Sequence, residues 1–212
     1  MQLIANERTS EQGTDEWFID RLGRVTASNF AVIMSKGRGN TESVGRINYR
    51  AQLVSERLSG AKAETWKSAE MTWGNETEPL ARLQYTLATG NDVIENGFFA
   101  HNDIMAGASP DGLVGEIGTL EIKCPNTATH IETLKKQATP TQYYWQMQGQ
   151  LWMTGRDWCD FVSYDPRLPA NAALFIKRVG RNDNDIEKLA EAVSDFLDTV
   201  DEEVNYIQNY KS

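Results

Sequence analysis

The sequence predicts an α/β (α+β) fold in which helices flank a central mixed β-sheet. Helical patterns fill the first part of the chain and strand patterns the middle, and two helices, two strands and one long helix follow. This grouped order is typical of a mixed sheet covered by helices. Residues 119–124 alternate polar and apolar side chains as a strand does, whereas residues 184–210 repeat apolar side chains at helical spacing. Because 212 residues can bury a sizeable core, we expect one domain over residues 1–212.

Two short helices are expected first. Residues 13–23 predict a helix with Thr14 or Asp15 as its cap and acidic side chains in its first turn. A second helix is expected to begin within residues 26–30, where Ser28 is either an ordinary cap or a hydroxyl that binds an anion. Taken alone, Ser28 fits the capping role better.

A Gly-rich loop and two longer helices come next. The loop, residues 35–45, carries Lys36 and Arg38 and fits a mobile substrate contact as well as it fits a solvated connector. Residues 47–58 and about 78–89 have the apolar spacing of helices. A glycine follows shortly after each of them, and glycine commonly ends a helix.

The remaining elements alternate between strands and helices. In order, the patterns predict a meander of three strands, two helices, two further strands and a closing helix. Their ranges are 92–100, 105–114, 118–124, 127–137, 140–155, 158–164, 173–179 and 184–210.

Composition argues against a membrane-spanning or disulfide-stabilised protein. Hydrophobic residues make up 40% of the chain, and no apolar run approaches the ~20 residues that cross a bilayer. The amino terminus lacks the basic and apolar layout of a signal peptide, so we expect a cytoplasmic location. Cys124 and Cys159 are too few for a disulfide framework, and we expect both to be reduced and buried.

Charge is unevenly distributed along the chain. The formal net charge is −9, which by itself argues against nucleic-acid binding because Lys and Arg usually supply that affinity. Residues 181–212 hold nine acidic and three basic side chains, a net charge of −6, so the closing helix is expected to be acidic. Residues 21–57 hold seven basic and two acidic side chains, a net charge of +5. This basic stretch is compatible with a polyanionic substrate.

Two carboxylates and one ammonium group are expected to converge within residues 109–125. Because side chains alternate along a strand, Glu121 and Lys123 leave the same face of the strand at 118–124. Asp111 lies between a proline and a glycine at an expected bend, where a hairpin return would bring its carboxylate beside Glu121. Two hard oxygen ligands and a cation facing one point predict a Mg²⁺ or Mn²⁺ site with a lysine next to a reacting water.

Less specific interpretations of these residues stay open at this point. Glu and Lys two positions apart also occur on solvated strands, but apolar side chains and a proline flank Glu121 and Lys123, which favours burial near a cleft. Glu76 and Glu78 stand at the start of the helix expected from about residue 78. Acids are common there because they complement the helix dipole.

The motif resembles that of the PD-(D/E)XK nucleases, with Pro110-Asp111 and Glu121-Ile122-Lys123 as its two halves. The wider pattern is similar to the phage lambda exonuclease and YqaJ-type viral recombinase family, in order from about residue 13 to 167. So many ordered matches are more specific than any single motif. The residues that match are Trp17, Arg21, 25–28, Trp73, Gly74, Glu78, 109–113, 120–125, Gln146, Gln148 and 164–166.

The resemblance implies a PD-(D/E)XK restriction-endonuclease-like core with a metal site. By resemblance, Asp111 and Glu121 are metal ligands, and the backbone carbonyl of Ile122 helps to hold a metal. Lys123 orients or activates the attacking water. Glu78 is the additional acid, because it lies four residues after the glycine of Trp-Gly. We expect two Mg²⁺ ions, for which Mn²⁺ can substitute, since such a pair stabilises both the attacking and the leaving oxygen.

The resemblance also implies a pocket for the terminal 5′-phosphate of DNA. An arginine fork with hydroxyl and amide donors would recognise a strand end instead of a base sequence. Each candidate residue also has an ordinary structural role when it is taken alone. Arg21 would form a surface ion pair, Ser28 a cap and Ser109 part of a turn, and Gln146 would be an ordinary helix amide. With DNA as substrate, Lys36 and Arg38 become candidate loop contacts. The candidate pocket residues are Arg21, Ser28, Ser109 and Gln146.

The activity implied by the resemblance is a 5′→3′ exonuclease that acts on linear double-stranded DNA ends with a 5′-phosphate. Mononucleotides would be released, leaving 3′ overhangs for recombination by strand annealing. The family also implies a homotrimer ring, a single-strand annealing protein as partner, no membrane association, and a phage or prophage origin in a bacterial host cytoplasm. Two alternatives stay open, namely an endonuclease or resolvase with the same metal site and a non-catalytic DNA end-binding scaffold. The complete set of Asp111, Glu121 and Lys123 argues against the scaffold.

Overall fold

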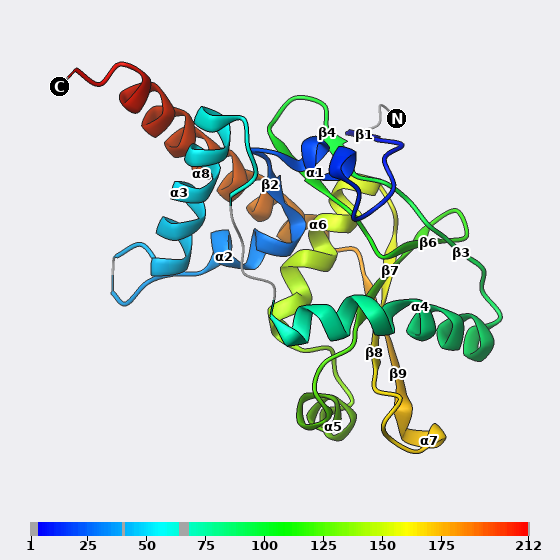
Figure 1. The fold of residues 1–212 in the computed structure, drawn as a ribbon. Helices are drawn as coiled ribbons and strands as arrows, with labels where there is room; N and C mark the ends of the chain where they lie inside the picture. The colour runs from blue at the N-terminus through cyan, green and yellow to red at the C-terminus, as the bar shows by residue number, and fades with distance from the viewer. Residues whose placement is uncertain (1–3, 40, 64–67, 212) are drawn as a thin grey trace.

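The fold is built on two mixed β-sheets with helices around and between them (Figure 1). The computed structural model describes residues 4–39, 41–63 and 68–211. The first sheet has the strand order β1-β4-β5-β2 and the second the order β3-β6-β7-β8-β9. The predicted α/β (α+β) class is confirmed, since each sheet contains both parallel and antiparallel pairs. The strands are β1 Ala5–Glu7, β2 Val25–Thr26, β3 Val93–Ile94, β4 Phe99–His101, β5 Ala106–Ala108, β6 Gly112–Val114, β7 Gly118–Lys123, β8 Trp158–Tyr164 and β9 Leu174–Gly180.

The central strand of the second sheet presents the motif. β7 pairs antiparallel with β6 and parallel with β8, so this strand is buried along almost its whole length. Leu120 and Ile122 belong to an apolar cluster with α4 (Ala69–Thr89), which crosses this sheet in Figure 1. Because neighbouring side chains on a strand point to opposite faces, Glu121 and Lys123 face away from that cluster.

The expected three-strand meander is wrong, because its strands are divided between the two sheets. β4 pairs with β5 in the first sheet, whereas β3 pairs with β6 in the second. The segments expected as single strands at 92–100 and 105–114 therefore each contain two short strands. Residues 109–111 link β5 to β6, so the chain passes from one sheet to the other at the first half of the motif. Alternation reports the faces of a strand and not its pairing partner, which is why it missed this division.

Most helices lie close to their predicted ranges, and the second one begins only at Phe30, the last residue of its expected start. Residues 26–30 contain the end of β2 and a 3₁₀ turn, Ala27–Asn29, before α2 begins. Ser28 lies in this turn and caps neither helix, so the capping interpretation of Ser28 is wrong. Besides α4, the helices are α1 Asp15–Arg21, α2 Phe30–Met34, α3 Val44–Ser59, α5 Thr127–Lys136, α6 Tyr144–Thr154, α7 Ala170–Ala173 and α8 Asp183–Gln208.

Helix α4 begins at Ala69, well before the start expected near residue 78. Ser68 caps it, because its side chain accepts a hydrogen bond from Met71 N at 3.2 Å. Proline normally occupies a first helical turn, yet Pro79 lies inside α4. Glu76 and Glu78 are consequently in the middle of the helix, and their interpretation as first-turn acids is wrong.

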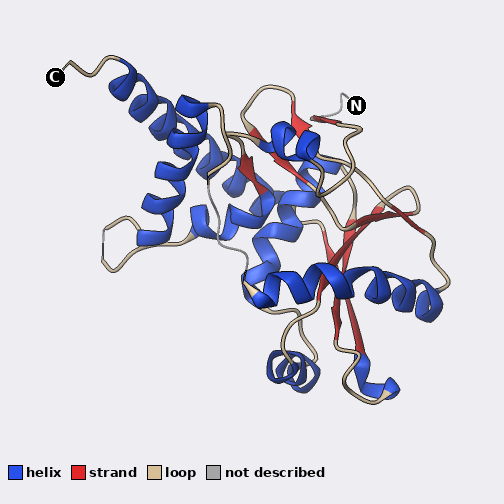
Figure 2. Cartoon of the chain, viewed as in Figure 1, coloured by secondary structure: helices blue, strands red, loops and turns tan. Residues whose placement is uncertain are grey.

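Helix α6 lies at the centre of the molecule, where it packs on strands of both sheets. Its residues 147–153 are all buried. On the side of the carboxyl terminus, α3 packs against α8 (Figure 1), over a core that includes Leu53, Leu189 and Phe196. Figure 2 shows the strands of the second sheet as a twisted layer crossed by α4. Within the described ranges, no helix is both long and apolar enough to cross a bilayer.

Replacing Phe196 by alanine should lower the free energy of unfolding by about 3–5 kcal/mol, because it removes a fully buried ring and leaves a cavity. The ring stacks on Tyr49 at a centroid distance of 5.7 Å. Tyr206 lies on the same helix but is 69% exposed, so Tyr206→Ala should change the free energy by less than about 0.5 kcal/mol. Denaturant titration measures both effects. Similar small losses for the two variants would contradict this packing.

Candidate functional site

Asp111 is held beside the middle of β7 by two backbone contacts. Its own N–H donates to Leu120 O at 3.0 Å. Its carboxylate oxygen Oδ2 accepts from Ile122 N at 2.6 Å. The hairpin register that pairs Gly112 with Leu120 fixes both contacts. The predicted hairpin return therefore does place Asp111 next to the Glu121 segment.

Glu121 is fully buried and its two oxygens are held by amides of α6. Oε1 accepts from Gln146 Nε2 at 2.6 Å, and Oε2 accepts from Gln150 Nε2. Lys123 Nζ forms an ion pair with Oε1. A buried carboxylate is tolerated when it is paired and hydrogen-bonded in this way. The alternation of β7 brings Glu121 and Lys123 together as predicted.

The ammonium group of Lys123 is enclosed by negative charge. Burial would lower its pKa, but the carboxylates of Glu121 and Asp111 outweigh burial and raise the pKa above its usual value. Its Nζ also lies 5.1 Å from the centre of the Tyr143 ring. Lys123 is therefore a cation at neutral pH that can donate hydrogen bonds.

The pair of carboxylates is electrostatically unfavourable without a further cation. Burial, and next the neighbouring Glu121, raise the pKa of Asp111 well above its usual range, although Lys123 opposes them. Two carboxylates and the Ile122 carbonyl are hard oxygen donors of the kind that Mg²⁺ and Mn²⁺ prefer. The donor chemistry thus fits a divalent ion, which would relieve the repulsion.

Glu78 lines the same cavity as Asp111 but is held by a different partner. On α4, its Oε1 accepts from Arg82 Nη2 at 2.8 Å, and Arg82 also forms an ion pair with Glu95. Burial raises the pKa of Glu78, whereas Arg82 opposes that rise. Across residues 4–39, 41–63 and 68–211, no three His, Cys, Asp or Glu side chains cluster closely enough to hold a metal by themselves. The structure therefore does not place Glu78 in one ligand cluster with Asp111 and Glu121.

The candidate phosphate pocket is organised by Ser109. Its hydroxyl oxygen accepts hydrogen bonds from Trp17 Nε1 at 3.1 Å and from Arg21 Nη1 at 3.3 Å. The Arg21 guanidinium lies over the Trp17 ring, 4.0 Å from its centre. This stacking fixes the direction in which the N–H groups of the guanidinium point. Burial lowers the pKa of Arg21 to about 10, so this arginine is a poorly solvated cation. Such a group is well suited to bind an anion.

One cavity of about 570 Å³ joins the two groups of residues. Glu121 lies behind its wall, fully buried. Cys124 lines the cavity and is only half-buried, contrary to the expected burial, whereas Cys159 is buried as predicted. Gln146 lines it as well, but its amide is bound to Glu121 and so belongs to the metal half. The other predicted residues that line it are Arg21, Ser28, Glu78, Ser109, Asp111, Ile122 and Lys123.

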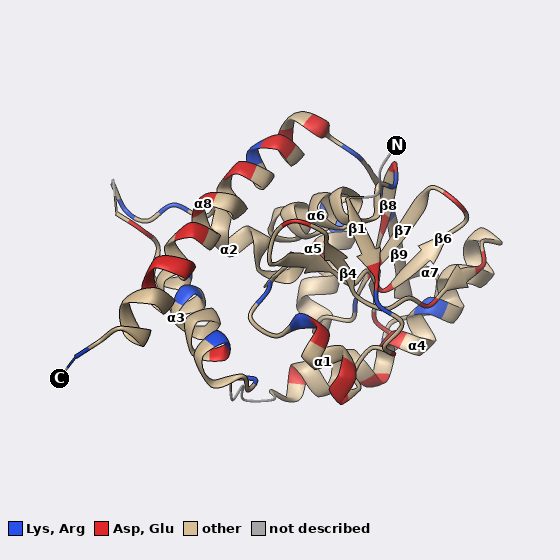
Figure 3. Cartoon of the chain, turned by 90° about the horizontal axis from the view of Figure 1, so that it is seen from above, with Lys and Arg blue, Asp and Glu red and all other residues tan. Residues whose placement is uncertain are grey.

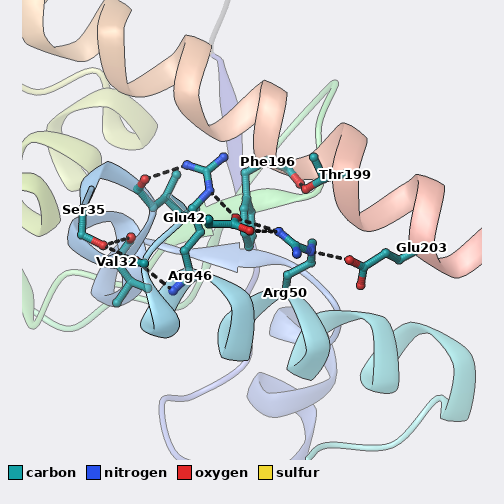
Figure 4. A network of polar contacts seen from close by, with 10 residues as sticks. Val32, Ser35, Glu42, Arg46, Arg50, Phe196, Thr199 and Glu203 are labelled. Carbon is teal, nitrogen blue, oxygen red and sulfur yellow. Dashed lines mark hydrogen bonds and ion pairs between the residues drawn. The ribbon is translucent and has the colours of Figure 1, made fainter. Parts of the chain in front are cut away.

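The basic loop is anchored at its end, and none of its described residues, 35–39 and 41–45, lines this cavity. Glu42 accepts from Arg46 at 2.9 Å and from Arg50 at 2.6 Å, and Arg50 also donates to Glu203 of α8 at 2.5 Å (Figure 4). These ion pairs tie the loop to α3 and to the acidic closing helix. Lys36 and Arg38 lie exposed in the loop and are not among the residues that line the cavity.

Sequence reasoning missed two residues that contact the candidate acids. Gln150 holds Glu121, and its position four residues after Gln146, on the same helical face, was the available signal. Arg82 stands four residues after Glu78, a spacing that commonly forms an ion pair on a helix. Neither belongs to the motif, so the pattern of acids did not point to them.

Comparison with known proteins places the chain in a recognised group. Residues 16–157 match the model of a family described as YqaJ-like viral recombinase domain. An alkaline exonuclease (LHK-Exo) from Laribacter hongkongensis has a structure that is 46% identical in sequence, with a TM-score of 0.86, covering 92% of this chain and 96% of that chain. LHK-Exo in complex with dAMP matches at the same identity and coverage with a TM-score of 0.85.

A more distant structure agrees in fold alone. The phage related exonuclease from Haemophilus somnus 129PT is 18% identical, with a TM-score of 0.72, covering 87% of this chain and 96% of that chain. No curated protein sequence matches this chain. The fold and the family expected from the resemblance are thereby confirmed.

Replacing Asp111 by asparagine should raise the unfolding temperature in metal-free buffer at neutral pH by at least about 2 °C. Since the folded state raises the pKa of Asp111, ionisation of this group opposes folding at every pH above its unfolded value. Asparagine removes the charge and can still accept from Ile122 N. Thermal unfolding in EDTA measures the change. Asp103→Asn, at an exposed position, is the control and should have no effect. A lower unfolding temperature for Asp111→Asn would contradict the conclusion that the ionised Asp111 carboxylate destabilises the metal-free fold.

Proposed function

The chain belongs to the YqaJ-like viral recombinase family, and on this basis we propose that it is a metal-dependent 5′→3′ exonuclease. It degrades one strand of linear double-stranded DNA to mononucleotides and leaves 3′ overhangs for recombination by strand annealing. The observation that carries the proposal is one cavity in which Asp111 and Lys123, backed by the buried Glu121, adjoin an arginine-hydroxyl pocket. The 46% identity to an alkaline exonuclease over 92% of the chain supports the same activity.

The acids have the role of holding the metal. Asp111, Glu121 and the carbonyl of Ile122 bind Mg²⁺, for which Mn²⁺ can substitute, and we propose two ions in the working enzyme. Such ions stabilise charge on the attacking and leaving oxygens and lower the pKa of a bound water. Glu78 lines the same cavity and supplies the additional carboxylate once it leaves Arg82.

Lys123 has the role of positioning the attacking water. Its ammonium group faces the cavity from the same strand face as Glu121, which holds it in place through an ion pair. Because the neighbouring carboxylates raise its pKa, Lys123 keeps its proton and acts as a hydrogen-bond donor. A water oriented by this donor would attack the scissile phosphate beside Asp111.

The arginine pocket accounts for strand polarity. The terminal 5′-phosphate is bound by Arg21, Ser28, Ser109 and Gln146. Gln146 also touches the metal half of the site, because its amide donates to Glu121. An enzyme that must hold a terminal phosphate cuts only at a strand end. The bond that reaches the acids is then the first internal phosphodiester of that strand.

Assembly and partners form a further part of the proposal. We propose a homotrimer ring through which the duplex passes, a single-strand annealing protein as partner, and a phage or prophage origin with action in the cytoplasm of a bacterial host. The acidic residues along α8 (Figure 3) suit an outer surface, because they would repel DNA from it. Lys36 and Arg38 are exposed cations available for loop contacts with DNA.

Purified protein should digest 5′-phosphorylated linear duplex when Mg²⁺ is present and leave a covalently closed plasmid intact. Asp111→Ala removes a metal ligand and Lys123→Ala removes the water donor, so each should lower the rate by more than about 100-fold. A gel of linear and circular substrates with and without EDTA measures this. Parental rates in these variants would reject the site, and cutting of the closed circle would favour an endonuclease.

Replacing Arg21 by glutamine should weaken the preference for a phosphorylated 5′ end. Loss of a charge-assisted fork to phosphate corresponds to a decrease of about 10- to 100-fold in kcat/KM on phosphorylated ends. The rate on 5′-hydroxyl ends should change little. Digestion of the two matched substrates gives the ratio, and an equal loss on both would reject the pocket assignment.

A further inference from the structure

A second, smaller cavity adjoins the candidate phosphate pocket. It has a volume of about 160 Å³, enough for a phosphate group, and its wall includes Arg24, Lys62 and Gln52. Trp17 and Arg21 line both this cavity and the larger one. These two stacked side chains therefore form the partition between the cavities.

Arg24 is a poorly compensated cation in this wall. It is only partly exposed, and within the described ranges its guanidinium makes no hydrogen bond or ion pair with the protein. Burial lowers its pKa, as does the nearby Arg8, and Asp20 only partly opposes them. By contrast, the neighbouring Arg57 is paired with Asp201. A desolvated cation without a partner favours the binding of an anion from outside.

Two other polar groups of this wall already have partners within the protein. The buried Glu56 is committed to Gly23 N at 2.9 Å and to Gln52 at 2.8 Å. Tyr49 accepts a hydrogen bond from Thr26 N at 3.1 Å. Lys62, whose ammonium lies 3.4 Å from the centre of the Phe18 ring, adds a second positive charge. The cavity thus combines two cations with aromatic walls, a composition typical of nucleic-acid backbone sites.

We propose that Arg24 and Lys62 form a second phosphate subsite that binds the backbone of the uncut DNA strand. This inference rests on the proposed function. The cut strand ends at the terminal-phosphate pocket, on the metal side of Trp17 and Arg21, so no phosphate of that strand remains to lie beyond them. A backbone phosphate on the far side belongs to the complementary strand. The subsite would hold that strand away from the acids while its partner is degraded.

The test compares binding of two DNA molecules that share one 5′-phosphorylated strand. One is that strand alone, and the other is its duplex with a complement that extends as a 3′ overhang. Binding is measured by fluorescence anisotropy in Ca²⁺, over a range of salt concentrations. The variants are Arg24→Gln, Arg24→Lys, Arg21→Gln and, as a matched control, Arg8→Gln. Arg8 is an exposed arginine that lines neither cavity.

Arg24→Gln should raise the Kd for the duplex by about 5- to 20-fold and reduce the salt slope by about 1, as for the loss of one phosphate contact. Its Kd for the single strand should stay within about 2-fold of the parent. Arg24→Lys, which keeps the charge, should recover most of the duplex affinity, whereas Arg21→Gln should weaken both substrates. Arg8→Gln should weaken neither by more than about 2-fold.

Three results would overturn the subsite. They are an unchanged duplex Kd in Arg24→Gln, an equal loss on the single strand, and a loss of the same size in Arg8→Gln. Failure of the parent to digest linear duplex with Mg²⁺ is a different outcome, because it rejects the proposed function itself. A parent that digests duplex normally, with Arg24→Gln binding it equally well, rejects the subsite alone.

Discussion

The buried carboxylate of Glu121 is the constraint on which the rest of the site depends. A charge that is removed from water needs partners, and Glu121 has one amide on each oxygen, from Gln146 and Gln150. Both amides come from α6, so these two hydrogen bonds fix the position of α6 along β7. Because α6 also packs on strands of the other sheet, the same contacts that neutralise Glu121 set how the two sheets meet. Core packing and site electrostatics are therefore one requirement.

The two halves of the candidate site are joined by the short segment from Ser109 to Asp111. Ser109 receives hydrogen bonds from Trp17 and Arg21, and Asp111, two residues later, receives one from Ile122. Residues 109–111 are the crossing between the two sheets. A pocket that holds a strand end and the acids that would cut beside it are thus fixed to one stretch of backbone. Such fixed spacing favours reaction at one bond, because the reacting groups lose little further entropy when they align.

The sequence predicted the parts of this arrangement that depend on local pattern. Strand alternation placed Glu121 and Lys123 on one face, and the bend at Asp111 implied its return to β7. Pattern could not show that the meander is split between two sheets, because pairing partners leave no periodic signal. The pattern also could not show that α4 begins ten residues before Pro79. Proline usually stands in the first turn of a helix, and tertiary packing overrides that preference here. Gln150 escaped notice because amides carry no charge pattern.

Calorimetric titration of Mn²⁺ tests most directly whether a divalent ion completes the pair of acids. The parent protein should bind Mn²⁺, and Glu121→Gln should bind at least about 10-fold more weakly, because the variant keeps the side-chain shape and loses the ligand charge. Gln142→Glu, which adds an exposed acid outside the cavity wall, should bind as the parent does. Equal affinity in the parent and in Glu121→Gln would contradict the central role given to this carboxylate.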